Sequence, residues 1–315
     1  REPIHPCHIA VVRSAYPDPK PFCVDVFCRN RCLFNVEILG VPKPRPSPRS
    51  AEKPFMTLPV AHQKNQIIAH LASQSVGQVW LSALLISAVV FTAAPEIDIT
   101  VSRFFFSDHF ILSDLTTVDV FRRGLLWGAA LPCVVALIAF SARLIRKPIF
   151  GFGAAPVHFT LLLHIVGPGM LVNGFLKQTS GRARPEYITD FGGTADFTPA
   201  LLFADQCSGN CSFVSAETSA LTASAISAFV LTSGVANNTH ARYIRILSLI
   251  GLGTIGVLRM ALGRHFLSDV VFAVLLTLGC AIALAHFFAR QHNTIRHTAP
   301  ATDLARLSRN RSTTD

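Results

Sequence analysis

Charged residues are scarce in this sequence. They make up 15% of its 315 residues, whereas 50% of the residues are hydrophobic and the mean hydropathy is +0.44. Tyr and Trp are also rare, with three and two copies, although Phe occurs 24 times. A soluble globular domain has about 25% charged residues, so this composition argues against one. It favours a protein that is embedded in a membrane.

Basic residues are few in the middle of the chain. Half of the 28 Lys and Arg residues lie in two terminal stretches, Arg1 to Lys53 and Arg290 to Arg311. The central region is close to charge balance, which argues against a groove for nucleic acid, so nucleic acid is not an expected partner. Basic ends beside a hydrophobic body fit cytosolic segments next to an anionic leaflet.

The sequence also lacks a convincing zinc-binding pattern. Cys28 and Cys32 have no second pair at a suitable spacing, so no metal site is expected there.

Residues 1–55 differ from the rest of the chain. They hold ten of the 19 Pro residues, no long apolar run and no Met, and the first Met is Met56. We expect 1–55 to be a disordered tail or a mis-called N-terminal extension. We expect 56–289 to form one membrane domain and 290–315 to form a basic cytosolic tail.

Six apolar runs after Met56 are candidate membrane spans, each of which needs roughly 20 apolar residues. Helices satisfy their own backbone groups in lipid. We therefore expect an all-α, polytopic bundle of six transmembrane helices, in preference to a soluble helical protein. Gly167-Pro168-Gly169 interrupts the third run, and the fifth run is short. The runs are 76–95, 125–142, 157–176, 218–236, 243–258 and 266–288.

Lys and Arg residues near the ends of the runs indicate their orientation. The loops after the second and fourth runs and the C-terminal tail are basic, so we expect them and both termini in the cytosol. The loop after the first run is acidic and belongs outside. The outer ends of the later runs then carry Lys177, Arg182, Arg184, Glu217, Arg259, Arg264, His265 and Asp269.

An up-and-down bundle brings these outer ends together. Basic residues are disfavoured on that side, so a shared anionic ligand such as phosphate would explain Lys177, Arg184 and Arg259. His265 and Asp269, four positions apart, would share a helix face, and the carboxylate would make the far ring nitrogen nucleophilic. An ordinary His–Asp pair and a metal site are the alternatives. The three cations favour a nucleophilic His265 that faces bound phosphate.

Three segments, KQTSGRARP (177–185), SFVSAETS (212–219) and RMALGRHFLSD (259–269), resemble the three-part signature of the type 2 phosphatidic acid phosphatases. This superfamily includes the vanadium haloperoxidases and has a six-helix membrane branch. The resemblance covers roughly 56–289 and implies a phosphatase that acts on lipid phosphates. It implies that His265 takes the phosphoryl group as phosphohistidine and that Asp269 orients it.

The same resemblance implies further roles. It places Lys177, Arg184 and Arg259 in a cradle that neutralises charge on the phosphate oxygens. Ser215 and the Ala216 amide fall at the positions that hold phosphate in the family. Water then cleaves the intermediate, and neither a metal ion nor another cofactor is required.

The second part departs from the family pattern, because Val214-Ser215-Ala216-Glu217 stands where Pro-Ser-Gly-His is usual. Leu258 also replaces the usual Ser before the last Arg of the signature. Glu217 takes the position of the general acid, and a partly desolvated Glu can carry the proton instead. The alternatives are that Glu217 only pairs with Arg182 or Arg264, or that the chain is an inactive member.

Cys207 and Cys211, with three residues between them, lie in the outer loop before Glu217. Oxidation is chemically permitted outside the cytosol, so we expect a disulfide that braces the approach to Glu217. Two free thiols are the alternative.

Together these features predict an integral membrane phosphatase, a phosphoric monoester hydrolase, in the plasma (inner) membrane. Its active site would lie on the outer, periplasmic face and act on a membrane lipid phosphate. The pattern of Glu for His beside a Cys pair resembles relatives that act on lipid A. Undecaprenyl pyrophosphate and phosphatidylglycerol phosphate are alternative substrates. A vanadate haloperoxidase and a non-catalytic lipid-phosphate binder or transporter are alternative functions.

Overall fold

The computed structural model describes residues 65–113, 115–146, 151–233 and 239–298. The segment expected as an extension, 1–55, lies outside the described residues, as does most of the expected tail, 290–315. The helices are α1 (Gln66–Leu71), α2 (Gln74–Ala93), α3 (Glu96–Phe104), α4 (Thr116–Leu144), α5 (Ala154–His164), the π-helix η1 (Ile165–Leu176), α6 (Lys177–Thr179), the 3-10 helices η2 (Pro185–Tyr187) and η3 (Thr189–Phe191), α7 (Ala216–Leu231), α8 (Thr239–Ala261) and α9 (Leu267–Thr298).

Five helical segments of the described chain are long and apolar enough to cross a membrane. They are α2, α4, the continuous segment Ala154–Thr179, α8, and α9 as far as Gln291. The apolar helix α7 is shorter, with 16 residues, or about 24 Å at 1.5 Å per residue. Every predicted run falls on one of these six helices, which confirms the all-α polytopic bundle.

The third predicted run is a continuous helix and is not broken at Gly167-Pro168-Gly169. This part is the π-helix η1, in which each N–H pairs with a carbonyl five residues earlier. Pro168 has no N–H to pair, and its carbonyl accepts a hydrogen bond from the Asn173 side chain at 2.7 Å. The helix therefore continues to Lys177 and carries that side chain to the end of the bundle.

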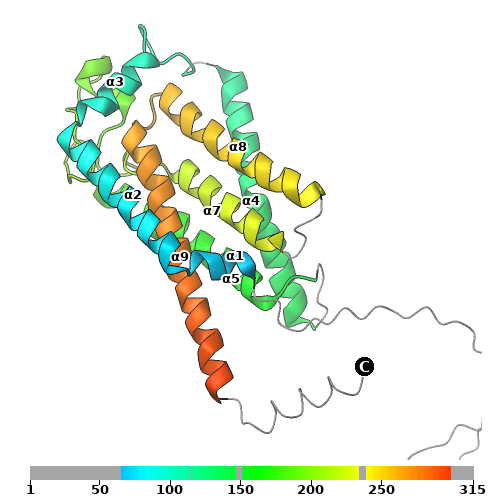
Figure 1. Ribbon diagram of the computed structural model, residues 1–315. Coiled ribbons are helices and arrows are strands. Elements are labelled where there is room, and N and C mark those ends of the chain that lie inside the picture. The colour runs from blue at the N-terminus through cyan, green and yellow to red at the C-terminus, as the bar shows by residue number, and fades with distance from the viewer. Residues whose placement is uncertain (1–64, 114, 147–150, 234–238, 299–315) are drawn as a thin grey trace, which may run out of the picture. The chain divides into compact units, whose positions relative to one another are not determined.

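The short helix α7 lies in the centre of the bundle (Figure 1), in contact with α4, α5, η1, α8 and α9. Small side chains on α7, including Ala223, Ser227 and Ala228, are buried, and they allow neighbouring backbones to approach closely. The Ser219 hydroxyl forms a hydrogen bond with the Thr277 hydroxyl of α9 at 2.7 Å. This packing fixes the position of the first turn of α7.

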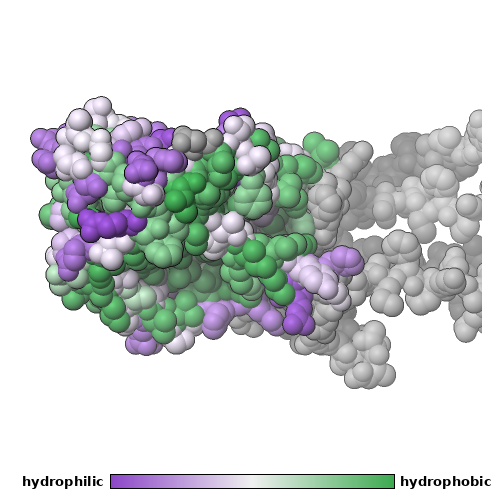
Figure 2. Space-filling view, turned by 90° about the horizontal axis from the view of Figure 1, so that it is seen from above, coloured by the Kyte–Doolittle hydropathy of each residue, from purple (hydrophilic) through white to green (hydrophobic). Residues whose placement is uncertain are grey.

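Large hydrophobic side chains are exposed along the outer helices, among them Val89 of α2, Trp127 of α4 and Leu247 of α8. Figure 2 shows hydrophobic residues over much of the face seen from above, with hydrophilic residues densest at the left and others along the edges. Exposed apolar surface on long helices fits contact with lipid.

At one end of the bundle, α3 and the start of α9 pack together, and α8 turns into α9 (Figure 1). The turn between α8 and α9 requires Gly263, which has a φ of +67° and lies so close to Phe110 that a Cβ atom would approach the ring to 2.4 Å. This tight turn brings Arg259 and His265 to the same end. We call it the site end.

Candidate active site

His265 lies in the turn before α9, and Asp269 lies in the first turn of that helix. Their exposed fractions are 1% and 0%. The imidazole Nδ1 is 3.6 Å from Asp269 Oδ2 and has no hydrogen-bond partner in the described part of the chain. Burial and the charges of Arg259 and Lys177 lower the pKa of His265 to about 3, so the ring is neutral and nucleophilic at neutral pH.

The Asp269 carboxylate is held on both oxygens. Ser212 Oγ and the Phe266 N–H donate to Oδ2 at 2.6 and 2.9 Å, and Arg182 donates to Oδ1 at 2.7 Å. These bonds prevent rotation of the carboxylate, so the edge that faces His265 is fixed.

Arg182 connects Asp269 to a second buried carboxylate, Asp98 of α3. Its other terminal nitrogen donates to Asp98 Oδ2 at 2.8 Å, and both side chains are 1% exposed. The Ser268 N–H donates to Asp98 Oδ1 at 2.8 Å, and the guanidinium lies 4.3 Å from the centre of the Phe266 ring. This network fastens α3 to the first turn of α9, behind the His–Asp pair.

Three cations gather at the same end as the imidazole. Lys177 at the end of η1 and Arg259 near the end of α8 are buried, with exposed fractions of 5% and 8%, and Arg184 is half-buried. The charges of Lys177 and Arg259 act on His265, and the charge of Arg184 acts on both other cations. The structure thus brings together the three basic residues that the sequence assigns to phosphate.

Glu217 lies in the first turn of α7 beside this cluster. Its Oε1 accepts a hydrogen bond from Arg122 of α4 at 2.6 Å and lies 3.4 Å from Arg259. Its Oε2 is buried and has no hydrogen-bond partner among the described residues. The two oxygens of Glu217 therefore differ: Oε1 accepts from Arg122 and lies near Arg259, whereas Oε2 has neither contact.

The alternative that Glu217 only pairs with Arg182 or Arg264 is wrong. Arg182 binds Asp269 and does not reach Glu217, and Arg264 donates to Glu186. The Glu186 N–H also donates to the Gly263 carbonyl at 3.0 Å, so the segment around Glu186 runs directly beside Arg264.

Ser215 and Ala216 form the start of α7. Ser215 Oγ caps the helix by accepting from the Thr218 N–H at 3.4 Å, and it also accepts from Thr218 Oγ1 at 2.8 Å. Ala216 is the first helical residue, where backbone N–H groups lack partners within the helix and favour anions. The assignment of both residues to phosphate stays a prediction.

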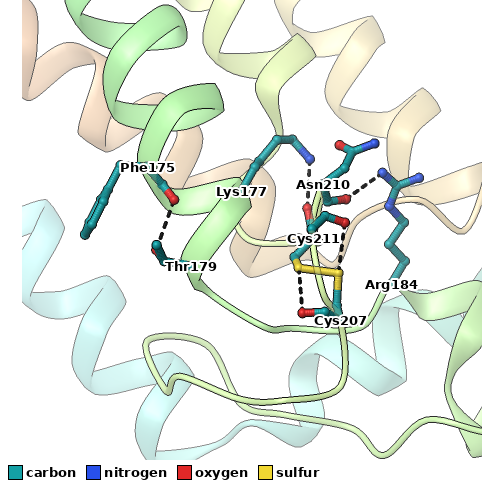
Figure 3. Close-up of a disulfide and its surroundings, with 8 residues drawn as sticks. Phe175, Lys177, Thr179, Arg184, Cys207, Asn210 and Cys211 are labelled. Atoms are coloured by element: carbon teal, nitrogen blue, oxygen red, sulfur yellow. Dashed lines mark hydrogen bonds between the residues drawn. A yellow bond between two sulfur atoms is a disulfide. The ribbon is translucent and has the colours of Figure 1, made fainter.

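Cys207 and Cys211 form a disulfide in the structure, with a Cα–Cα distance of 5.7 Å. Figure 3 shows the loop that they close beside two of the cations. Lys177 Nζ donates to the Cys211 carbonyl at 2.8 Å, and Arg184 donates to the Asn210 carbonyl at 2.9 Å. We call residues 207–211 the disulfide loop, and these two hydrogen bonds brace Lys177 and Arg184.

Comparison with known proteins supports one family. The model of the PAP2 superfamily matches residues 158–293. The lipid A 4'-phosphatase of Rhizobium leguminosarum is 32% identical over 223 residues, which cover 62% of this chain and 88% of that protein. The chain belongs to the PAP2 superfamily.

Two other relatives carry the same name. The lipid A 4'-phosphatase of Rhizobium etli is 32% identical over 226 residues, 60% of this chain and 81% of that protein. The lipid A 4'-phosphatase of Francisella tularensis subsp. novicida is 35% identical over 107 residues. These residues make up 34% of this chain and span 46% of the length of that protein. No solved structure matches this PAP2 chain with significant similarity.

Two residues of the site lie outside the part that the PAP2 model matches. Asp98 comes from α3 and Arg122 from α4, whereas the matched region begins at 158. Sequence reasoning assigned neither of them a role, and it gave Arg182, which lies within the match, only the alternative role of pairing with Glu217. The available signal was a charged residue beside a predicted span, which by default is a functional candidate.

Proposed function

We propose that this PAP2 protein is an integral membrane phosphatase that hydrolyses a phosphate monoester of a lipid, with lipid A as the substrate. One observation carries the proposal: a buried, neutral His265 lies beside Lys177 and Arg259, and Arg184 lies near both of these cations, at one end of a membrane bundle. A lipid can keep its chains in the bilayer while its phosphate reaches this end. The relatives named lipid A 4'-phosphatase support the choice of lipid.

The first step transfers the phosphoryl group to the enzyme. Because Nδ1 faces Asp269, Nε2 of His265 attacks phosphorus. A phosphorus–nitrogen bond forms while the bond between phosphorus and the lipid oxygen breaks. The three cations stabilise the charge on the equatorial oxygens, and Asp269 stabilises the phosphohistidine cation.

Glu217 supplies the proton that the departing lipid oxygen needs. A protonated carboxyl accepts on one oxygen and donates from the other, and Oε1 already accepts from Arg122. In the proposed step Oε2 is therefore the oxygen from which the proton is donated. After the lipid alcohol leaves, the carboxylate takes a proton from the water that attacks phosphohistidine. Inorganic phosphate is released and neutral His265 is restored.

Basic side chains supply the positive charge that stabilises the phosphate oxygens, so we propose that the reaction does not depend on an added metal ion. Phosphate release should then be the same with and without EDTA.

We also propose that the site end faces outward in the plasma (inner) membrane, with both termini in the cytosol. Arg143 and Arg245 lie near the opposite ends of α4 and α8 from the site, as the positive-inside rule favours. A membrane-impermeant maleimide applied to intact cells tests this with Asp108→Cys at the site end and Ala155→Cys at the other. Labelling of Asp108→Cys alone supports the proposal, and labelling of Ala155→Cys alone contradicts it.

The function is tested by phosphate release from purified protein on lipid A, undecaprenyl pyrophosphate, phosphatidylglycerol phosphate and phosphatidic acid. We expect lipid A to lose one phosphate by mass spectrometry, and His265→Ala to release none above background. A wild-type protein that hydrolyses another lipid and leaves lipid A intact would overturn the substrate. Unchanged turnover by His265→Ala would overturn the nucleophile.

A further inference from the structure

A pocket of about 400 Å³ adjoins the cation cluster. Its lining consists of Ala183, Arg184, Tyr187 and residues 206–210. Arg184 belongs to both the pocket and the cation cluster. It lines the pocket and donates to the Asn210 carbonyl of the disulfide loop, and its charge acts on Lys177. The volume is within the range of small-molecule sites, about 300–1,000 Å³.

Both walls of the pocket are fixed by backbone contacts. The Tyr187 carbonyl accepts two N–H groups from the following turn at 2.9 Å each, and a Cβ on Gly193 would lie 2.0 Å from that carbonyl oxygen. On the other wall, the disulfide closes the loop and the Cys211 N–H donates to the Lys177 carbonyl at 3.0 Å. The pocket is therefore formed before any ligand binds.

The chemistry of the lining is polar, with one aromatic ring. Ser208 and Asn210 contribute a hydroxyl and an amide, and Tyr187 is 51% exposed. A Tyr side chain offers a flat apolar face and a hydroxyl. A second pocket, by contrast, is lined mostly by aliphatic residues such as Leu112 and Val257. An acyl chain fits the second pocket better, and a ring with hydroxyl and amide substituents fits the first.

We propose that the polar pocket binds the sugar ring that carries the scissile phosphate. This rests on the proposed function: with the phosphate on Arg184, the esterified alcohol lies next to the pocket. Lipid A offers a glucosamine ring at this position, whereas a glycerophospholipid such as phosphatidic acid offers none. Tyr187, Ser208 and Asn210 then determine specificity for sugar-linked phosphate, while the cations serve any phosphate monoester.

Two variants test the pocket without touching the proposed catalytic groups. Tyr187→Ala removes the ring. Ser208→Ala removes the hydroxyl and leaves in place the Asn210 and Cys211 carbonyls that hold Arg184 and Lys177. We expect each to lower kcat/KM for lipid A about tenfold and to leave kcat/KM for phosphatidic acid within about twofold. Tyr243→Ala, at an exposed Tyr near the start of α8 at the opposite end of the bundle, is the matched control.

Equal losses on both lipids, or no loss on either, would overturn the proposal. If wild-type protein hydrolyses phosphatidic acid but not lipid A, the proposed substrate fails. The pocket is still tested by competition, in which a soluble phosphorylated glucosamine disaccharide inhibits hydrolysis of phosphatidic acid. Stronger inhibition than by inorganic phosphate, reduced in Tyr187→Ala, supports the pocket. Equal inhibition of wild type and Tyr187→Ala contradicts it.

Discussion

Arg122 donates to Glu217 Oε1 at 2.6 Å and so joins α4 to the first turn of α7. The same guanidinium is held by Asp119, which accepts from its Nε at 3.0 Å and from a terminal nitrogen at 2.5 Å. Asp119 thus fixes the position of the Arg122 side chain independently of Glu217. Because Arg122 occupies Oε1, Oε2 is the oxygen of Glu217 that can contact the substrate. We infer that Arg122 positions the proton donor.

Substitution Arg122→Gln should therefore lower kcat on lipid A, by about 10- to 100-fold, because a misplaced acid transfers its proton poorly. The loss should almost disappear in a Glu217→Gln background, since both changes affect the same proton. A double-mutant cycle of kcat values measures this coupling.

The neighbouring Arg123→Gln is the control for this cycle. Arg123 also binds Asp119, but its side chain is 68% exposed, so turnover should stay close to wild type. Independent, multiplicative losses from Arg122→Gln and Glu217→Gln would show that Arg122 does not act through Glu217.

Substitution Arg182→Lys should destabilise the protein and slow turnover together. Lys lacks the planar fork that binds Asp98 and Asp269 at the same time, so one buried carboxylate would lose its partner, at a cost of about 3–5 kcal/mol. Thermal unfolding in detergent and kcat check both effects.

The exposed pair of Arg103 and Asp190, 3.9 Å apart with Arg103 66% exposed, provides the comparison for this prediction. Arg103→Ala should cost less than about 1 kcal/mol, because water screens surface pairs. An Arg182→Lys protein that unfolds and turns over like wild type would mean that the network does not hold Asp269.

The helices could be predicted because each span must pair its own backbone in lipid, which imposes a long apolar run. Run 243–258 thus predicted α8, which extends to Thr239–Ala261 because polar residues at its ends remain helical. The π-helical register around Pro168 could not be predicted, because hydropathy does not distinguish 3.6 residues per turn from a wider helix.

The site could be predicted where its residues follow one another in the sequence, as Arg259, His265 and Asp269 do. Arg122 and Asp98 could not be assigned, because their contacts depend on how α4 is rotated and where α3 packs. Glu217 illustrates the same limit, because its bond to Arg122, 95 positions away in the chain, depends on the same packing.

Loss of the disulfide should weaken substrate binding more than it slows the chemical step. The disulfide loop holds Lys177 and Arg184 through its carbonyl oxygens, so Cys207→Ser/Cys211→Ser should raise KM several-fold and change kcat less. Cys133→Ser/Cys280→Ser removes the free thiols of the described chain and should leave both constants unchanged. A reductant should raise KM in wild type only, and an equal rise in the Cys207→Ser/Cys211→Ser protein would contradict this role.

Because His265 is buried, the protein should become less stable as the pH decreases. Its pKa is about 3 in the folded protein and about 6.5 in an unfolded chain. Between these values the unfolded chain binds a proton that the folded protein excludes, so the free energy of unfolding falls as the pH drops from about 6.5 towards 3. One such proton accounts for about 1.4 kcal/mol per pH unit. His265→Gln removes this contribution, so the pH dependence of its thermal midpoint in detergent should be shallower than that of wild type between pH 6 and pH 4. Parallel curves for the two proteins would mean that His265 is protonated in the folded state and is not the neutral nucleophile that the reaction requires.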